Sequence, residues 1–301
     1  MNLLALVPLL FSPVQPDIIG GSDVPPQDPV AQSTVLIIGK IARATFTCSG
    51  TIIGNDLVLT AGHCLGGPGY ASLTVYFSTD RDGSGPAIAV KQQERPDSYN
   101  TDHDGKPWDD IALLKLAEPI PAGYHPVPTL ADAQWIQNGA QLLLAGYGMN
   151  VPVAPEDGDG GTGHLRKVEQ KILQADYTKS EMLVDIHEKG SCFGDSGGPA
   201  YIETAKGLIL AGVTSHLTEN DRLPDEGHRK RYGCLVDMVY TNVLAQSEWI
   251  RSAAAKLILS PDAGRWRRIG SSPGDRRSAR ARAPRSTGSR PRGNRASCGC
   301  A

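Results

Sequence analysis

The chain has few aromatic residues and no long uninterrupted hydrophobic run. Phe, Trp and Tyr make up 6% of its 301 residues, so we expect glycine and β-branched residues to fill much of the core. The most apolar stretch, residues 3–11, is too short to cross a bilayer. We therefore expect no transmembrane segment. An apolar content of 40% is enough for one large or two small cores.

Residues 1–17 lack two marks of a secretory signal. No Lys or Arg precedes the apolar stretch, and no small-x-small cleavage site follows it. The stretch still has the apolar character of a signal-peptide core, so residues 1–17 are predicted to be a signal or pro-segment. A truncated or misassigned start would explain both defects, and a disordered pro-segment is the alternative interpretation.

Acidic residues are scarce at the C-terminal end. Residues 261–301 hold eleven Arg against two Asp, a net charge of +9, so the total of −2 leaves −11 on residues 1–260. The segment is rich in Arg, Ser, Pro and Gly without periodicity, and residues 259–301 are predicted to be a disordered Arg-rich tail. Aromatics are not interleaved beyond Trp266, so no specific nucleic-acid binding is predicted. Binding to nucleic acid or membrane by charge alone, a solvated tail and translation of a shifted reading frame all remain open.

Only six cysteines are present, and they fall into three pairs along the chain. They are Cys48 and Cys64, Cys192 and Cys234, and Cys298 and Cys300. Disulfides in an exported protein are the favoured interpretation, and buried free thiols in a reducing compartment are the alternative. Cys298 and Cys300 also fit a processing or attachment signal, and their role stays undecided.

Ser196 lies on a glycine-flanked turn within residues 191–199, Ser-Cys-Phe-Gly-Asp-Ser-Gly-Gly-Pro. Small neighbours allow the backbone amides of Gly194 and Ser196 to point at one spot, which predicts an oxyanion hole beside a nucleophile. A serine hydroxyl needs a base and a residue that orients the base. His63, in Leu-Thr-Ala-Gly-His-Cys, and Asp110, at the start of Asp-Ile-Ala-Leu-Leu-Lys-Leu, are the candidates.

The order His, Asp, Ser and the spacing of these residues resemble the chymotrypsin-like (trypsin-fold) serine endopeptidases. His63 precedes Asp110 by 47 residues, and Asp110 precedes Ser196 by 86. Further segments similar to that family are Ile-Ile-Gly-Gly at 18–21, Gly-Tyr-Gly at 146–148, Gly-Val-Thr-Ser at 212–215 and Val-Tyr-Thr at 239–241. The resemblance covers about residues 18–258.

The resemblance implies an all-β fold of two antiparallel six-stranded β-barrels with a C-terminal helix. Short alternating or β-branched runs agree with it, and turn residues separate them. The runs are 33–38, 51–60, 73–77, 87–91 and 111–116, then 141–145, 167–173, 199–202, 207–213 and 238–243. We expect one protease domain over 18–258, with barrels at about 18–127 and 128–243. Residues 244–258 have helical spacing.

The resemblance also implies roles for single residues. His63, Asp110 and Ser196 would be catalytic, the amides of Gly194 and Ser196 would form the oxyanion hole, and Ser215 would hydrogen-bond the aspartate and pair with substrate. Two disulfides, Cys48–Cys64 and Cys192–Cys234, are implied in the same way.

Activation is expected to couple Ile18 to Asp195. In the family, the α-amino group of the first mature residue, here Ile18, pairs with the carboxylate at the position of Asp195, so the protein would be a zymogen. Asp17 stands where Lys or Arg is customary. Another type of activating protease, or an aminopeptidase, would therefore be needed.

The residues expected to line the substrate pocket differ from the trypsin pattern. They are Gly190, Phe193, Ser215, His216, Leu217 and Met238. Gly190 stands where trypsins carry an aspartate, and the bulk of Leu217 and Met238 favours small or medium apolar side chains. Two alternatives remain: Asp237 as the pocket floor, and a preference for acidic substrates set by the basic run 228–231 in the insertion 217–232.

The sequence thus predicts a serine endopeptidase that acts through an acyl-enzyme on proteins or peptides. We expect it to be secreted, extracellular or periplasmic, and monomeric, with no cofactor and no metal. For the acidic loop 150–163, a solvated loop is favoured over a calcium site. The alternatives for function are a catalytically silent homologue that serves as a binding module and, less favoured, a general esterase.

Overall fold

The computed structural model describes residues 18–41, 44–65, 70–82, 85–100, 108–151, 160–218, 234 and 237–259. The predicted signal segment, nearly all of the Arg-rich tail, Cys298 and Cys300 lie outside these residues. So do most of the acidic loop 150–163 and most of the insertion 217–232 with its basic run.

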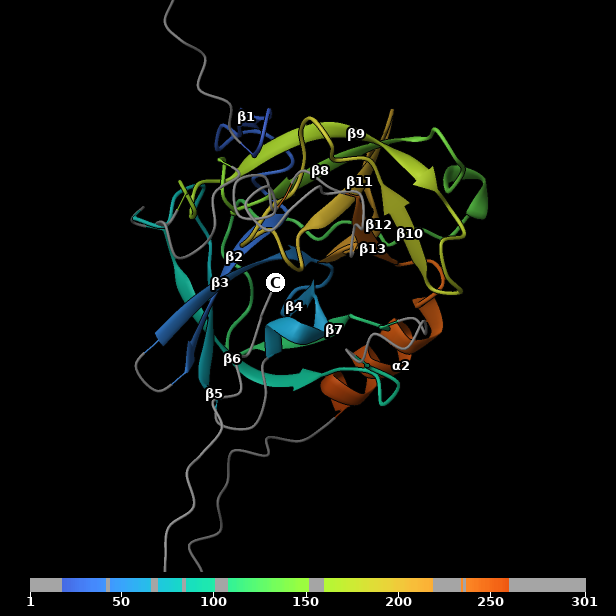
Figure 1. The fold of residues 1–301 in the computed structure, drawn as a ribbon. Coiled ribbons are helices and arrows are strands. Elements are labelled where there is room, and N and C mark those ends of the chain that lie inside the picture. The colour runs from blue at the N-terminus through green and yellow to red at the C-terminus, as the bar shows by residue number, and fades with distance from the viewer. Residues whose placement is uncertain are drawn as a thin grey trace, which may run out of the picture. The chain divides into compact units, whose positions relative to one another are not determined.

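Two antiparallel β-barrels make up most of the described residues, as predicted (Figure 1). In the first barrel six strands close in the order β2-β3-β4-β7-β6-β5. The bounds are β2 Thr34–Ile41, β3 Ala44–Ile52, β4 Leu57–Thr60, β5 Tyr70–Tyr76, β6 Ala87–Glu94 and β7 Ala112–Leu116. A short 3-10 helix, η1 (Gly62–Leu65), follows β4.

In the second barrel six strands close in the order β8-β9-β10-β13-β12-β11, and a two-residue strand, β1, is added at β9. The bounds are β1 Ser22–Asp23, β8 Gln141–Gly146, β9 Arg166–Gln174, β10 Glu181–Val184, β11 Pro199–Thr204, β12 Gly207–Leu217 and β13 Met238–Asn242. A second 3-10 helix, η2 (Ala133–Trp135), precedes β8.

Burial along the strands follows the two-residue period of a pleated sheet. On β9, Val168 and Ile172 are buried, whereas Glu169 and Lys171 between them are exposed. The first strand of the first barrel is different, because Thr34–Ile38 is continuously buried. Such an unbroken apolar run is typical of a strand that is covered on both faces.

Two details of the strand prediction were wrong. The run predicted over 51–60 is two antiparallel strands, β3 and β4, joined at Gly54–Asp56, because Gly, Asn and Asp favour a turn over an extended strand. The strands β1 and β10 were not predicted at all. Both are short, and each pairs with a strand that lies far away in the sequence, β1 with β9 and β10 with β13.

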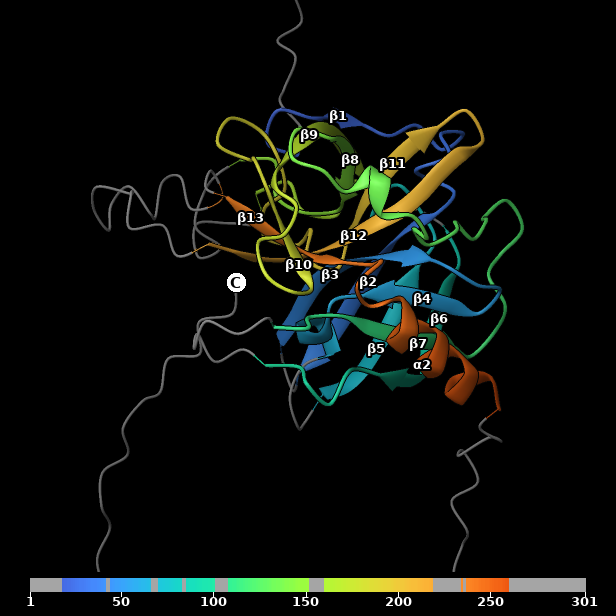
Figure 2. The ribbon, with the colours of Figure 1, turned by 90° about the vertical axis from the view of Figure 1, so that its right-hand side faces the viewer.

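The helix α2 (Ser247–Leu259) packs on the first barrel, although it follows the last strand of the second one (Figure 2). Ile250, Ala253 and Leu257 bury one face of α2 in the core of the first barrel. Lys115 of β7 donates a hydrogen bond to the Leu257 carbonyl over 2.9 Å. Among the described residues, no helix has both the length and the apolar character needed to cross a membrane.

Candidate active site

His63 and Asp110 are held together by the pairing of β4 with β7. His63 lies in η1 directly after β4, and Asp110 precedes β7 by two residues. His63 Nδ1 is 2.7 Å from Asp110 Oδ2, and the backbone N–H of His63 donates to Asp110 Oδ1 over 2.8 Å. Because a carboxylate only accepts hydrogen bonds, Nδ1 carries the proton, and in the neutral ring Nε2 keeps a lone pair.

Asp110 also accepts a hydrogen bond from the second barrel. Ser215 Oγ on β12 donates to Asp110 Oδ2 over 2.6 Å, and Thr241 Oγ1 on β13 donates to the Asp110 carbonyl over 2.9 Å. Asp110 is fully buried. The carboxylate therefore joins both barrels, and each of its oxygens has at least one donor.

The residue before Asp110 turns the chain into this position. Asp109 has a φ of 44°, a left-handed conformation that aspartate tolerates better than most residues. Its Oδ1 accepts hydrogen bonds from Ser180 Oγ (2.7 Å) and Gln246 Nε2 (2.6 Å). These contacts fix the left-handed residue and thereby the direction of Asp110.

The surroundings shift the pKa values of both groups. Burial alone lowers the pKa of His63, but the charge of Asp110 and the hydrogen bond to it raise that pKa above its usual value. Burial alone raises the pKa of Asp110, and the charge of His63 together with the hydrogen bonds from His63 and Ser215 outweighs it, so the pKa of Asp110 is lowered. The pair thus keeps Asp110 ionised and makes His63 a stronger base.

Ser49 connects the loop around Ser196 to the first barrel. Ser49 N donates to the Ser196 carbonyl over 2.8 Å, and Ser49 Oγ donates to the Gly194 carbonyl over 3.0 Å. The same Oγ accepts a hydrogen bond from Tyr147 N over 3.0 Å. Ser49 lies on β3 and is fully buried. The Ser196 loop is therefore held by the barrel that carries His63.

Ser196 lies beside the histidine loop. Its carbonyl oxygen is 3.6 Å from the sulfur of Cys64, the residue that follows His63. His63 Nε2 is buried and has no hydrogen-bond partner among the described residues. A bond from Ser196 Oγ to Nε2 is thus not formed in this structure, and catalytic hydrogen bonds are often long until substrate binds.

Two backbone amides of this loop are candidates for binding an oxyanion. Within the described residues, the structure records no acceptor for the N–H of Gly194 or Ser196, whereas Asp195 N donates to the Cys192 carbonyl over 3.0 Å. Gly194 has a φ of 98°, which other residues rarely adopt. The backbone conformation at Gly194 therefore depends on the absence of a side chain.

Asp195 points away from this turn into a buried site. Its Oδ1 accepts from Gly148 N and its Oδ2 from Cys192 N, both over 2.8 Å. A Cβ on Gly146 or Gly148 would lie 2.2 or 2.4 Å from the carboxylate oxygens, so only glycines leave room for it. Burial raises the pKa of Asp195 to about 7, although the two amides and the charge of Arg166 act in the opposite direction.

The segment that begins at Ile18 packs into the second barrel. Ile18 is fully buried in the core of the second barrel, and Ile19 forms a bridge with Gly190, whose N–H donates to the Ile19 carbonyl over 2.8 Å. Ile18 has a φ of 36°. A left-handed conformation is strained for a β-branched residue.

The residues expected to line the pocket fall into different surroundings. Gly190 has a φ of 150°, and a Cβ there would lie 2.3 Å from Ile186 Cγ2, so the position accepts no side chain unless Ile186 moves. Met238 is buried in the core of the second barrel, and Leu217 packs against that core. Phe193 packs against the Cys192–Cys234 cluster.

His216 stacks on Trp108, with ring centroids 3.7 Å apart and an angle of 13° between the planes. Its Nδ1 lies 2.9 Å from Ser215 Oγ. The stack brings a residue of the second barrel onto the segment that leads to Asp110.

Both disulfides implied by the resemblance are present. Cys48 of β3 is bonded to Cys64 of η1, and Cys192 is bonded to Cys234. The first bond fastens the residue next to His63 to a barrel strand. The second joins the loop before Ser196 to the segment before β13.

Two groups of described side chains have ligand types and spacing that a metal ion could use. In the first, with His63, both cysteines are used in the Cys48–Cys64 disulfide and offer no thiolate. In the second, His187 Nδ1 lies 3.0 Å from Asp185 Oδ1 and 3.3 Å from Asp237 Oδ1. The Asp237 carboxylate thus lies beside His187, but its Oδ1 forms no hydrogen bond among the described residues, since His187 Nδ1 is hydrogen-bonded to Asp185 Oδ1.

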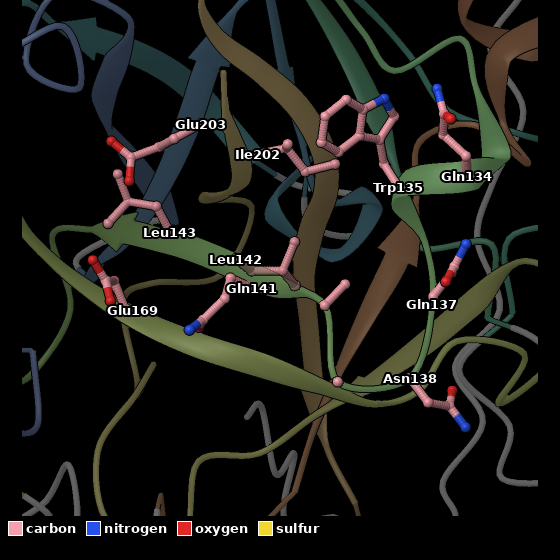
Figure 3. A pocket seen from close by; sticks show the side chains of 12 residues that line it. Gln134, Trp135, Gln137, Asn138, Gln141, Leu142, Leu143, Glu169, Ile202 and Glu203 are labelled. Atoms are coloured by element: carbon pink, nitrogen blue, oxygen red, sulfur yellow. The ribbon is translucent and has the colours of Figure 1, made fainter. Parts of the chain in front are cut away.

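A hollow of about 600 Å³ lies on the second barrel, away from these residues. Its lining comes from η2 with the segment after it, and from β8, β9 and β11, and it includes none of His63, Asp110 and Ser196. Figure 3 shows Trp135 near Ile202, and Glu203 and Glu169 toward the opposite side. The hollow is therefore separate from the hydrogen-bonded group around Asp110.

Comparison with known proteins identifies the family of the chain. A family model described as Trypsin matches residues 18–249. The chain belongs to the trypsin family. This trypsin-family protein is a serine endopeptidase, and the fold predicted from its motifs is the fold of the family.

Several relatives of this trypsin-family protein have modest identity to it. Mast cell protease 2 of Meriones unguiculatus is 29% identical over 74% of this chain and 92% of its own length. Duodenase-1 of Bos taurus is 25% identical over 84% of this chain and 96% of its own length. Trypsin theta of Drosophila erecta is 27% identical over 71% of this chain and 79% of its own length. A solved HL collagenase structure has a TM-score of 0.63 at 19% identity, covering 79% of this chain and 99% of its own. At that identity it supports the fold alone.

Some residues of the site were not found from the sequence. Ser49 and Trp108 are the main ones, together with Glu181, whose Oε1 accepts from Trp108 N over 2.8 Å. Serine and glutamate occur throughout the chain, so residue type alone does not distinguish these two. Trp108 had one usable signal, because it lies two residues before the candidate aspartate and the chain has only four Trp.

Proposed function

We propose that this serine endopeptidase hydrolyses peptide bonds with Ser196 as nucleophile, His63 as general base and Asp110 as the residue that orients the base. The observation that carries the proposal is the fixed His63 ring. Asp110 holds Nδ1 over 2.7 Å, and the buried, unpartnered Nε2 lies on a residue adjacent to the Ser196 loop. A base whose Nδ1 is fixed and whose Nε2 is free to accept supports this assignment, because a serine hydroxyl needs such a base in order to lose its proton.

In the proposed reaction, Ser196 Oγ attacks the substrate carbonyl carbon while its proton moves to His63 Nε2. Asp110 stabilises the imidazolium that forms, and the amides of Gly194 and Ser196 donate to the developing oxyanion. The imidazolium then gives its proton to the leaving amine. Water then attacks the acyl-enzyme carbonyl and gives a proton to His63 Nε2, and that proton passes to Ser196 Oγ as the bond between Oγ and the acyl carbon breaks.

Covalent labelling tests this assignment. A fluorophosphonate should label Ser196 in protein that begins at Ile18, and the Ser196→Ala variant should take up no label and lose activity by about 10⁴- to 10⁶-fold in kcat. Both disulfides should still form, because Ser196 is a small, partly exposed residue. Peptide cleavage by Ser196→Ala at the parent rate would overturn the triad assignment.

Activation is proposed to require a free amino group on Ile18. The Asp195 carboxylate is buried with a pKa of about 7, so a nearby ammonium would stabilise its charged form. The φ of 36° at Ile18 exists only while residue 17 is attached, because φ is defined by the preceding carbonyl carbon. Cleavage before Ile18 therefore removes a strained torsion, which costs about 1–3 kcal/mol. The protease that cleaves after Asp17 would be a partner of this protein.

Substrate selection is proposed to favour small or medium apolar residues on the acyl side of the scissile bond. Gly190 carries no charge, Ile186 occupies the space of a side chain there, and Asp237 lies against His187. A basic substrate side chain would lose its water without gaining a partner.

Rates on matched peptides that end in Ala, Leu, Phe, Arg and Glu measure this selectivity. We expect the highest kcat/KM for Ala or Leu. A preference for Arg that disappears in Asp237→Asn would show that Asp237 supplies a charge to the pocket. A preference for Glu would point to the insertion 217–232.

The cellular location and oligomeric state of the protein are proposed from its family membership. Trypsin-family proteins are typically secreted, and the two disulfides suit an oxidising compartment. We infer a secreted monomer that acts on protein or peptide substrates. Size-exclusion chromatography with light scattering of the processed protein tests the monomer.

A further inference from the structure

A third hydrogen bond extends the row of side chains at Asp110 by one more residue, His216. Ser215 Oγ donates to Asp110 Oδ2 over 2.6 Å, and His216 Nδ1 lies 2.9 Å from the same Ser215 Oγ. The row therefore runs from His216 through Ser215 and Asp110 to His63.

A bulge in β12 makes this contact between neighbouring residues. In a regular strand the side chains of consecutive residues point to opposite faces. Against β13, however, Thr214 pairs with Tyr240 and His216 with Val239, so Ser215 is an extra residue without a partner in the register. Such a bulge redirects side chains. Ser215 Oγ and His216 Nδ1 can then approach each other.

Counting protons fixes the direction of each hydrogen bond. The lowered pKa of Asp110 keeps it a carboxylate, which only accepts. Ser215 must therefore use its single hydroxyl proton on Asp110, and its oxygen can only accept from His216. It follows that His216 Nδ1 carries a proton and donates it to Ser215 Oγ.

The stack on Trp108 holds the His216 ring in this orientation. The ring planes are 13° from parallel, and the ring centroids lie 3.7 Å apart. Trp108 is itself held by its backbone N–H, which donates a hydrogen bond to Glu181 Oε1 over 2.8 Å. A ring that is clamped on one face and hydrogen-bonded at one edge has little freedom to rotate.

We propose that His216 is a positioning residue that acts through Ser215 on Asp110 and thereby sets how strongly Asp110 attracts a proton on His63. A hydroxyl that accepts a hydrogen bond becomes a better donor, because hydrogen bonds in a row polarise one another. Ser215 then forms a stronger hydrogen bond to the Asp110 carboxylate, and the carboxylate attracts the proton on His63 less strongly. The inference rests on the proposed triad and goes beyond it.

Two substitutions separate this role from a purely structural or substrate-binding one. His216→Phe keeps an aromatic ring for Trp108 and removes the Nδ1 donor. His216→Asn removes the ring and places an amide N–H at the position of Nδ1. Both changes are at a half-buried position, and circular dichroism verifies folding.

In His216→Phe we expect the acidic limb of the kcat/KM profile to move up by about 0.5 pH unit, because Asp110 attracts the His63 proton more strongly. The value of kcat at pH 7 should fall about two- to threefold with KM nearly unchanged, and should recover at high pH. His216→Asn should keep the parent pH midpoint. The other carboxylates whose charges interact near Asp110 are Asp109 and Glu181, which neither variant alters.

A double-mutant cycle tests the route through Ser215. In a Ser215→Ala background, His216→Phe should cause no further shift of the pH midpoint. If His216→Phe leaves the midpoint unchanged, or if the shift persists without Ser215, the proposal is wrong. Fluorophosphonate labelling of each variant distinguishes this failure from failure of the triad, which would abolish labelling of the parent protein as well.

Discussion

At the scale of single residues, Asp110 is the group on which the site depends. It accepts hydrogen bonds from the His63 ring, the His63 backbone and Ser215, and it is fully buried. A buried charge is tolerated only when it is paired and hydrogen-bonded. Any change that removes a donor therefore acts on the pKa of His63 as well as on stability.

The pH dependence of activity should report this pairing. His63 is a base only when it is neutral, and its pKa lies above the usual histidine value because of the charge of Asp110. We expect the acidic limb of kcat/KM to have its midpoint above about 6.5. In Asp110→Asn the charge is lost, the midpoint should fall, and activity should drop by about 10⁴-fold. A midpoint below 6 in the parent protein would contradict the pairing.

Residue type decided which parts of the site the sequence could predict. His63, Asp110 and Ser196 stand in short motifs whose chemistry allows few substitutes. Ser49 has no such motif, since its contribution is a bond to the Gly194 carbonyl 145 positions away. Such bonds depend on the packing of the two barrels, which a local pattern does not contain.

At the scale of elements, β3 does more than close a barrel. Its residue Ser49 bonds the Gly194 and Ser196 carbonyls and the Tyr147 amide, so one strand of the first barrel holds a loop of the second. Its residue Cys48 is bonded to η1 beside His63. The same strand therefore holds both the loop of Ser196 and the segment of His63 in place.

Removal of the Ser49 hydroxyl should weaken both stability and catalysis. Ser49→Ala leaves the buried Tyr147 N–H and Gly194 carbonyl without their partner, and we expect a loss of about 1–3 kcal/mol in unfolding free energy. We also expect kcat to fall about tenfold, because Gly194 also supplies a proposed oxyanion donor. Urea denaturation and steady-state kinetics measure the two effects.

Ser33→Ala is the matched control for this variant. Ser33 is equally buried, and its Oγ donates to the Pro29 carbonyl over 2.9 Å and lies 3.1 Å from Tyr201 OH. It should lose stability without a change in kcat. Equal kinetic effects of the two variants would mean that Ser49 acts only through global stability.

The elements themselves were predictable where the sequence has an alternating or β-branched run. The run at 167–173 lies within β9, whose burial alternates, and the run at 207–213 lies within β12, which is almost continuously buried. The strand β10 escaped prediction because it has only four residues and begins with a charged one, Glu181, buried through hydrogen bonds to Trp108 and Thr178. Its place in the sheet is set by β9 and β13.

At the scale of the whole molecule, buried hydroxyl groups join the two barrels. Tyr201 OH of the second barrel lies 3.0 Å from Thr34 Oγ1 and 3.1 Å from Ser33 Oγ of the first. Tyr147 OH donates to the Ser78 carbonyl over 2.6 Å. Directional bonds fix the relative position of the barrels, and the residues of the site come from both of them.

Processing before Ile18 should change how stability depends on pH. The pKa of Asp195 is about 7 in the folded chain, above the value of about 4 for an unfolded aspartate. The folded state therefore binds more protons, and the unprocessed protein should lose stability as pH rises from about 4 to 7, by up to about 4 kcal/mol. Protein that begins at Ile18 should lose less, because its ammonium compensates the Asp195 charge.

Urea denaturation of both forms at pH 4.5, 6 and 7.5 gives this difference directly. Peptidase activity should follow the same order, with the form that begins at Ile18 far more active than the unprocessed chain. A form with one extra residue before Ile18 is the control and should behave as unprocessed. Equal pH dependence and equal activity of all three forms would show that Asp195 is not the partner of the new amino group.

The attachment of the segment that follows Ile18 sets the kinetics of that switch. Gly190 binds the Ile19 carbonyl, and β1 pairs with β9 only a few residues later. A newly released amino group is therefore delivered by a tether of a single residue, at an effective concentration far above that of any free amine in solution. Once the bond is cut, onset of activity should be first order, independent of protein concentration and insensitive to added amines.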